Sequence, residues 1–133
     1  MSLENIEPSG GGRLRFQRLR ADPEAFALTQ IVARERGVAL TKMLRRTRGS
    51  GHAAAARQLA IYLVHTLLGR PQDAVADLFT RDRTTIAHAV GSMEDLRDEA
   101  RRGGRLLEAE IARIETQLRE RIGRTAEEFD HAA

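Results

Sequence analysis

Residues 81–90, with the sequence RDRTTIAHAV, place charged and hydrogen-bonding side chains where a helix is expected to begin. The N-terminus of a helix carries unpaired backbone N–H groups and a partial positive charge, so it favours phosphate. Arginine can donate a pair of hydrogen bonds to a guanine edge, aspartate can accept from cytosine, and threonine can bond to phosphate or contact a thymine methyl. The candidate DNA-binding residues of this segment are Arg81, Asp82, Arg83, Thr84, Thr85 and His88.

Each of these side chains also has an ordinary structural role open to it. Asp82 could cap the helix, either threonine could bond to the backbone, and His88 could be a solvated surface residue. Helical spacing favours the DNA-binding interpretation, because it separates an apolar face from a polar one. The apolar face is Ile86, Val90, Met93 and Leu96, and the polar face is Thr84, Thr85, His88 and Ser92.

A short helix is expected directly before this segment. It follows the Gly69-Arg70-Pro71 break, and its apolar residues Val75, Leu78 and Phe79 have the spacing of a helical face. A turn of about three residues then leads into the longer helix. The sequence therefore predicts a helix-turn-helix motif whose second helix keeps its polar face and basic N-terminus outward.

The remaining elements are also predicted to be helical, giving an all-α fold. Asp22-Pro23 starts a helix that Gly37 ends, Thr41 caps a short helix through Leu44, residues 45–52 form a basic loop, and residues 53–68 form a central buried helix. We expect residues 1–21 to be a flexible basic tail, residues 22–100 to be the DNA-binding domain, and residues 101–133 to be a C-terminal helix that frays from Arg124.

The C-terminal helix has an apolar seam of alternating four- and three-residue steps. That seam could form a coiled coil, and hence a homodimer, or it could pack on the chain's own domain. It is shorter than the three or four heptads typical of a coiled coil, which favours packing on its own domain. The seam residues are Leu107, Ile111, Ile114 and Leu118.

Composition narrows the classes of function. The 133-residue chain has no cysteine and neither a leader pattern nor an apolar run long enough for a membrane span, so we expect a single cytoplasmic domain. Residues 13–83 hold fourteen Lys or Arg against six acids, which favours a polyanionic partner, although arginine could simply be common in this chain. The only lysine, Lys42, lies between Thr41 and Met43, which excludes a P-loop. We expect no catalytic residues, cofactor or metal, because the four histidines show no metal-ligand spacing with acids and no nucleophile–base pair can be recognised.

Two segments resemble the C-terminal DNA-binding domain of the bacterial replication initiator DnaA. They are ARQLAIYL at residues 56–63 and AVADLFTRDRTTIAHAV at residues 74–90, and the resemblance extends over about residues 25–118. The family's signature matches Arg81, Asp82, Thr84, Thr85, His88 and Ala89. The resemblance implies a Trp-repressor-like helical domain, here with an additional C-terminal helix, and a recognition helix in the major groove.

The same resemblance suggests further contacts with DNA. An arginine of the family's basic loop enters the minor groove, and its candidates here are Arg45, Arg46 and Arg48. The family's Arg-Gln pair near the phosphates matches Arg57 and Gln58. Two positions depart from the family: Thr80 stands where a Gly-Gly pair precedes the signature, and Arg83 replaces a histidine associated with base contact, which predicts a shifted sequence preference.

These observations lead us to expect a nucleoid protein that binds double-stranded DNA at DnaA-box-like sites. It would regulate replication initiation or transcription, by competing or cooperating with the initiator at its boxes. The alternative is an adaptor that acts on the replication machinery through its C-terminal helix and binds DNA weakly or without sequence preference. An enzyme is the least favoured class, and no membrane partner is expected.

Overall fold

The structure, a computed structural model, describes residues 10–45, 51–103 and 106–132, and within these ranges every regular element is a helix. The prediction of an all-α fold is therefore confirmed. The helices are α1 (Gly10–Arg20), α2 (Pro23–Arg36), α3 (Leu40–Met43), α4 (Gly51–Thr66), α5 (Gln72–Phe79), α6 (Arg83–Gly103) and α7 (Leu106–Ala132).

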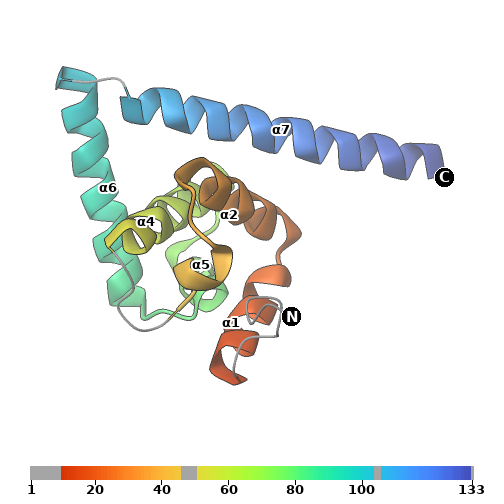
Figure 1. Ribbon diagram of the computed structural model, residues 1–133, viewed down its shortest axis with the longest axis horizontal. Coiled ribbons are helices and arrows are strands. Elements are labelled where there is room, and N and C mark those ends of the chain that lie inside the picture. The colour runs from red at the N-terminus through yellow and green to blue at the C-terminus, as the bar shows by residue number, and fades with distance from the viewer. Residues whose placement is uncertain (1–9, 46–50, 104–105, 133) are drawn as a thin grey trace.

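Helix α4 lies at the centre of the domain, and α2, α3, α5 and α6 pack around it (Figure 1). Its side chains are apolar on most sides, so it can be buried along nearly its whole length. The buried residues of α4 are Ala53, Ala56, Leu59, Ala60, Ile61, Tyr62, Leu63 and Val64. This confirms the central buried helix, which begins two residues earlier and ends two residues earlier than the predicted range of 53–68.

The predicted limits of α2 are confirmed in atomic detail. Asp22 occupies the N-cap, and its Oδ1 accepts from the Ala25 backbone N–H at 3.2 Å. At the other end Gly37 adopts φ 64°, a left-handed conformation that glycine takes without steric cost, and its N–H donates to the carbonyls of the last turn.

Two boundaries around α3 differ from the sequence prediction. Ala39 is the N-cap, and its carbonyl accepts from the backbone N–H groups of Lys42 and Met43, so Thr41 lies inside the helix and does not cap it. The basic loop was predicted over residues 45–52, but Gly51 and His52 already belong to α4. Residues 46–50 lie outside the described part of the chain.

The prediction of a flexible tail over residues 1–21 is wrong for residues 10–20, which form α1. Leu19 on this helix is fully buried, and the rings of Phe16 and Phe26 meet edge to face with their centroids 5.5 Å apart. Full burial of a leucine side chain contributes roughly 1.5–3 kcal/mol, and the half-buried Phe16 adds a smaller contribution. That contribution offsets the low helix propensity of the glycines at the start of α1.

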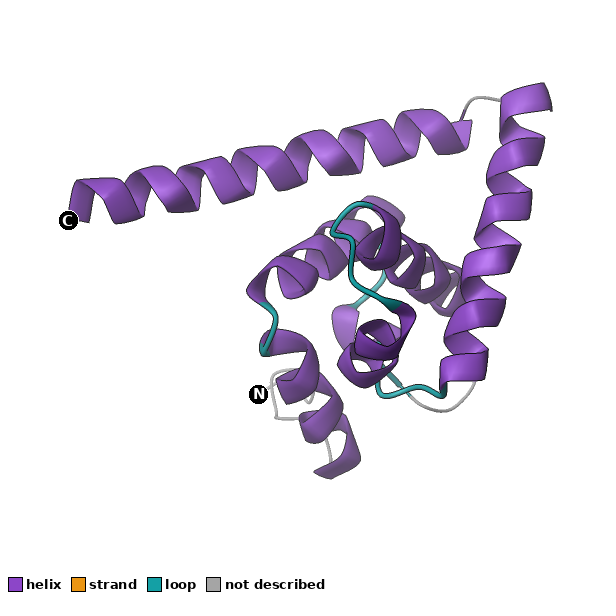
Figure 2. Cartoon of the chain, turned by 180° about the vertical axis from the view of Figure 1, so that it is seen from behind, coloured by secondary structure: helices purple, strands orange, loops and turns teal. Residues whose placement is uncertain are grey.

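Helix α6 packs one face on α4 and then extends beyond the core (Figure 2). Ile86, Val90 and Met93 are buried as predicted, whereas Leu96 is 47% exposed. The apolar face predicted for α6 is therefore confirmed for its first three residues and wrong for the fourth, because Leu96 lies past the part of α6 that the core covers.

Helix α7 turns back and packs along α2. Ile111, Ile114 and Leu118 are buried in the core of their own chain, which confirms packing on the domain. Buried in this way, these three side chains offer no surface for the homodimer considered above. The predicted fraying from Arg124 is wrong, since α7 continues to Ala132; the Ala and Glu residues of this stretch are good helix formers.

Ion pairs connect α7 to the rest of the domain. Glu110 accepts from Arg36 of α2 in a two-point pair, and Glu108 accepts from Arg97 of α6 at 2.7 and 3.2 Å. Arg97 also donates to the Tyr62 hydroxyl at 3.2 Å, which links α6, α7 and α4. The Arg97 guanidinium lowers the pKa of Glu108, so this carboxylate stays charged to more acidic pH.

The N-cap of α2 predicts an acid-sensitive contribution to stability. Hydrogen bonds from Arg70 lower the pKa of Asp22, so folding gains from its charged form above the ordinary aspartate pKa and loses that gain as pH falls through the lowered value. Asp22→Ala should reduce the free energy of unfolding at neutral pH by about 1 kcal/mol or more, from the lost cap and ion pair. Asp22→Asn should keep the N-cap hydrogen bond and reduce the free energy of unfolding by less than Asp22→Ala does. Urea unfolding at neutral and acid pH measures both.

In that experiment Asp22→Asn should lose less stability on acidification than the native chain. Glu24→Gln is the matched control, because its carboxylate also pairs with Arg70 but is 48% exposed, where an ion pair contributes little. An equal acid loss in the native chain and in Asp22→Asn would contradict this account of Asp22.

Candidate nucleic-acid interface

The turn between α5 and α6 has the geometry of a helix-turn-helix corner. The Thr80 N–H donates to the Asp77 carbonyl at 3.3 Å, and the Arg81 N–H donates to the Ala76 carbonyl at 3.0 Å, which closes α5. The Asp82 carbonyl accepts from the Ile86 N–H at 3.1 Å and opens α6. Residues 80–82 are thus the three-residue turn, and the predicted motif is confirmed.

Thr80 occupies a backbone conformation that normally requires glycine. Its φ is 53° and its ψ is 53°, and it is the one non-glycine residue with positive φ in the described ranges. A β-branched side chain is disfavoured there. Thr80 Oγ1 is also buried without a hydrogen-bond partner in the described structure, which adds a desolvation cost. The turn keeps its shape because Phe79 and Ile86, which flank it, are both buried.

The first two turns of α6 present their polar side chains to solvent. Thr84, Thr85 and His88 are all exposed, whereas Ile86 and Ala89 between them are buried against the core. Asp82 is exposed just before the helix. The helix therefore offers solvent a continuous surface of hydroxyl, imidazole and backbone N–H groups at its positive end.

Arg83 pairs with a carboxylate of the preceding helix. Its Nε lies 3.0 Å from Asp73 Oδ1, and the two side chains are 75% and 70% exposed. Ion pairs this exposed contribute about 0–1 kcal/mol and are screened by salt. Arg83 can therefore exchange Asp73 for a phosphate or a base edge at little cost.

Arg81 joins the turn to the beginning of the basic loop. Its Nη2 donates to the backbone carbonyl of Arg45, and its Nη1 donates to the Thr80 carbonyl at 3.4 Å. Arg45 is exposed at this junction. The structure thus brings Arg45 next to the helix-turn-helix corner. Arg46 and Arg48, the other two candidates for minor-groove contact, lie outside the described residues.

Arg57 and Gln58 lie on α4, where Arg57 already has a structural role. Its Nη1 donates to the carbonyl of Met43 at 3.0 Å, at the end of α3. Burial lowers the pKa of its guanidinium, although a guanidinium in a protein stays charged. Gln58 is half-buried. Arg57 therefore fixes α3 on α4, and its remaining N–H groups are the ones that could donate to phosphate.

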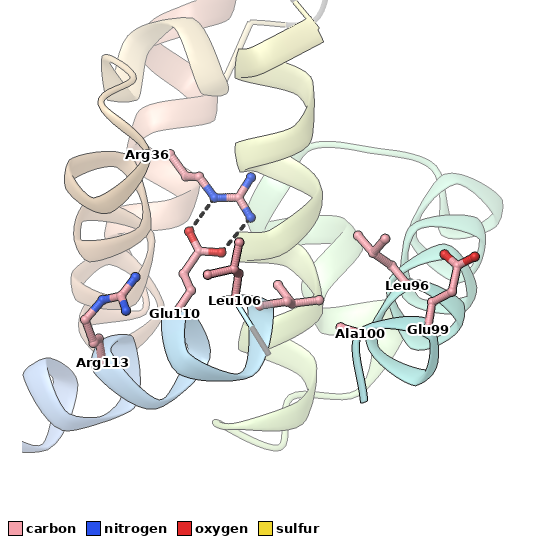
Figure 3. A pocket seen from close by; sticks show the side chains of 8 residues that line it. Arg36, Leu96, Glu99, Ala100, Leu106, Glu110 and Arg113 are labelled. Carbon is pink, nitrogen blue, oxygen red and sulfur yellow. Dashed lines mark hydrogen bonds and ion pairs between the residues drawn. The ribbon is translucent and has the colours of Figure 1, made fainter. Parts of the chain in front are cut away.

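A separate hollow lies at the other end of α6, where it meets α7 (Figure 3). It measures about 650 Å³, and two of the leucines that line it, Leu96 and Leu106, are 47% and 88% exposed. Leu96 is thirteen residues from Arg83 along α6, which corresponds to about 20 Å. The hollow is therefore distinct from the polar surface at the N-terminus of α6.

Residues 10–45, 51–103 and 106–132 lack two further kinds of feature. These residues hold no group of three or more His, Cys, Asp or Glu that could bind a metal ion. They also hold no helix with the length and apolar character needed to cross a bilayer.

The sequence matches a known protein family over the region that contains this motif. Residues 27–93, half of the chain, match the model of the bacterial dnaA protein helix-turn-helix. The chain belongs to this DnaA helix-turn-helix family. Domains of the family bind double-stranded DNA, and the matched residues of this DnaA-type domain include the helix-turn-helix motif formed by α5 and the first turns of α6. Comparisons with curated proteins and with solved structures found no match.

The family match leaves out both ends of this DnaA-type chain. It begins within α2 and ends within α6, so α1, the last turns of α6 and α7 lie beyond it.

Two interactions at the interface could not be predicted from the sequence, namely the ion pair of Arg83 with Asp73 and the hydrogen bond of Arg57 to the Met43 carbonyl. Asp73 lies ten residues before Arg83, and only the angle between α5 and α6 brings them together.

The strained turn predicts a stabilising substitution. Thr80→Gly should raise the free energy of unfolding by about 1 kcal/mol, because relief of roughly 1–3 kcal/mol of strain exceeds the entropy cost of glycine. Thr80→Ala removes the same hydroxyl but keeps Cβ. The difference in stability between the two variants therefore measures the backbone strain that a Cβ atom causes at positive φ. Equal stability of Thr80→Gly and Thr80→Ala in urea unfolding would contradict the strain.

The Arg83–Asp73 pair predicts a gain of affinity on removal of the carboxylate. Asp73→Asn should tighten DNA binding at low salt by up to about fivefold, since Arg83 no longer has to leave an ion pair. Asp77→Asn makes the same charge change one turn later on α5, where the side chain is also exposed. Fluorescence anisotropy should give the larger gain for Asp73→Asn, and equal gains would indicate a general charge effect instead.

Proposed function

We propose that this protein binds double-stranded DNA sequence-specifically at DnaA-box-like sites, with the first turns of α6 in the major groove. The observation that supports this most directly is that α6 has one polar, exposed face and one apolar, buried face. Its polar residues Thr84, Thr85 and His88 are exposed at the helix N-terminus, while the opposite face is buried against α4. A helix held in this way can enter the groove without rearranging the core.

In the proposed complex the residues around α6 make different kinds of contact with DNA. Arg83, Thr84, Thr85 and His88 read base edges or bond to the adjacent phosphates, and Asp82 accepts from a cytosine amino group. Arg81 contributes charge at the turn and holds Arg45 beside it. The basic loop that starts at Arg45 anchors the protein in the neighbouring minor groove, with Arg46 and Arg48 as further candidates.

The sequence preference should differ from that of a domain with histidine at the Arg83 position. Arginine prefers the O6 and N7 atoms of guanine, and a good two-point contact is worth about 1–3 kcal/mol of discrimination. Arg83 is 75% exposed at the start of α6, which is compatible with either a base or a phosphate contact.

The proposed action is binding and not catalysis. The 133 residues contain no P-loop lysine, so we assign no ATP-driven assembly to them. Occupancy of boxes at the nucleoid would influence replication initiation or transcription, by excluding the initiator from shared sites or by binding beside it.

An adaptor function remains the second candidate, because the structure offers one feature that suits it. The hollow between α6 and α7 exposes Leu96 and Leu106, and apolar side chains in a hollow of this size can receive an apolar side chain of a partner protein. Replacement of Arg45, Arg46 and Arg48 by Ala separates the candidates. A DNA reader should lose affinity for DNA and its function together, whereas an adaptor should keep its partner.

The first test is fluorescence anisotropy with one duplex that carries a DnaA-type box and one scrambled duplex, measured across a salt series. A box preference that persists at high salt is the expected result, because base contacts are less salt-dependent than phosphate contacts. Equal binding that fades together with salt would leave a non-specific basic protein, and absence of binding to either duplex would favour the adaptor.

Arg83→His tests the basis of the preference. The variant should change the preferred base at one or two box positions, with discrimination shifted by about 1–3 kcal/mol, as measured by binding to duplexes with each base substituted in turn. Arg119→His on α7 is a control for introducing histidine at an exposed arginine outside α6. Identical profiles for the native chain and Arg83→His would contradict base reading by Arg83.

A further inference from the structure

We propose that α1 is a second DNA-binding element, which contacts the phosphate backbone beside the site read by α6. This inference rests on the proposed function and adds a surface outside the family match, which begins at residue 27. It arises from the structure, because the sequence alone predicts only a flexible tail in this region.

The position of α1 follows from its packing. It packs on α5, and α5 packs on α6, so α1 extends the helix-turn-helix motif on the side of its first helix. Figures 1 and 2 show α1 and the first turns of α6 at the same end of the molecule, away from α7. In a helix-turn-helix complex the first helix crosses the DNA backbone while the second enters the groove. An element packed on the first helix therefore lies near the flanking phosphates.

The charge of α1 suits phosphate. Its sequence, GGGRLRFQRLR, contains four arginines and no acid. Arg15 and Arg20 lie partly against the protein, since the Arg15 Nε atom is buried and the Arg20 guanidinium lies 5.7 Å from the centroid of the Phe26 ring. Arg13 and Arg18 are exposed at opposite edges of the solvent-facing half of the helix. Either edge can thus present a guanidinium to a duplex.

The neighbouring helix α5 carries the opposite charge. Helix α5, QDAVADLF, carries Asp73 and Asp77 and no basic residue, and both carboxylates are exposed. Once Arg83 exchanges Asp73 for DNA, α5 without α1 would oppose phosphate with two negative charges. The four arginines of α1 outnumber the two aspartates of α5, so the two helices together carry a charge of +2, which favours the approach of a DNA strand.

The burial of Leu19 gives α1 a fixed place rather than the freedom of a tail. Leu19 is fully buried, Phe16 packs on Phe26, and the Ala21 and Asp22 N–H groups bond back to the last turn of α1. A folded helix loses less conformational entropy on binding than a disordered basic segment does. The contacts of α1 with DNA should therefore lie on one particular flank of the binding site. A disordered basic segment would instead attract DNA on both flanks.

The test compares Arg13→Gln/Arg18→Gln with the native chain on three duplexes: the box alone, and the box extended by about ten base pairs on one flank or the other. The log–log salt slope of the native chain should steepen when one particular flank is present. The double variant should lose that steepening, by about one unit, because each phosphate contact contributes about 0.9. The ratio between box and scrambled duplexes should stay the same, since phosphate contacts carry no base information.

Two controls separate this role from simpler ones. Arg13→Lys/Arg18→Lys keeps both charges and should retain the flank dependence. Arg119→Gln/Arg124→Gln removes two exposed charges from α7, which packs away from α5, and should leave the slope unchanged. Matching thermal melts would show that α1 remains folded in each variant.

The outcomes distinguish this inference from the proposed function. A native-like slope and flank dependence in Arg13→Gln/Arg18→Gln would overturn the role of α1 while leaving DNA reading by α6 intact. An equal loss of slope in the α7 control would also overturn it, since the effect would then come from net charge alone. Failure of the native chain to bind any duplex would overturn the proposed function and this inference together.

Discussion

Burial of one side of α6 against α4 is the constraint on which the proposed DNA surface depends. Ile86, Val90 and Met93 enter the core, and each buried side chain of this size contributes roughly 1.5–3 kcal/mol. A rotation of α6 that hid Thr84 or His88 would have to withdraw these side chains. The polar face is therefore held outward by the core itself, before any DNA is present, and the strained Thr80 backbone is tolerated because the residues on both sides of it are anchored in that core.

The parts of the fold that depend on local signals could be predicted from the sequence. The Asp22 cap, the Gly37 terminus and the apolar face of α6 each lie within a few residues of the element that they define. Helix α1 could not be predicted in this way, because its glycines signal a linker and its stability comes from Leu19 and Phe16 packing on distant residues. The continuation of α7 past Arg124 was missed for a related reason, since good helix formers without an apolar pattern give only a weak signal.

The candidate site likewise combines features that local sequence predicts with interactions between distant residues. The residue types at the start of α6 indicate DNA from the sequence alone, because their chemistry and spacing are local. Their partners are not local: Arg81 meets the carbonyl of Arg45, thirty-six residues away, and Arg57 meets that of Met43. These interactions show that part of the basic charge is used to fix α3 on α4 and the start of the loop on the helix-turn-helix corner. Simple counting of arginines would assign all of that charge to DNA.

The Arg83–Asp73 pair has a consequence for how the protein would find its site. In the proposed complex the Asp73 carboxylate would compete for Arg83 with every phosphate that the protein meets, whether or not the surrounding sequence matches. At about 0–1 kcal/mol, this competition would shorten each dwell on non-matching DNA by up to about fivefold. Because a genome offers at least about a million non-matching positions, a shorter dwell at each of them would reduce the time that the protein spends bound away from its target.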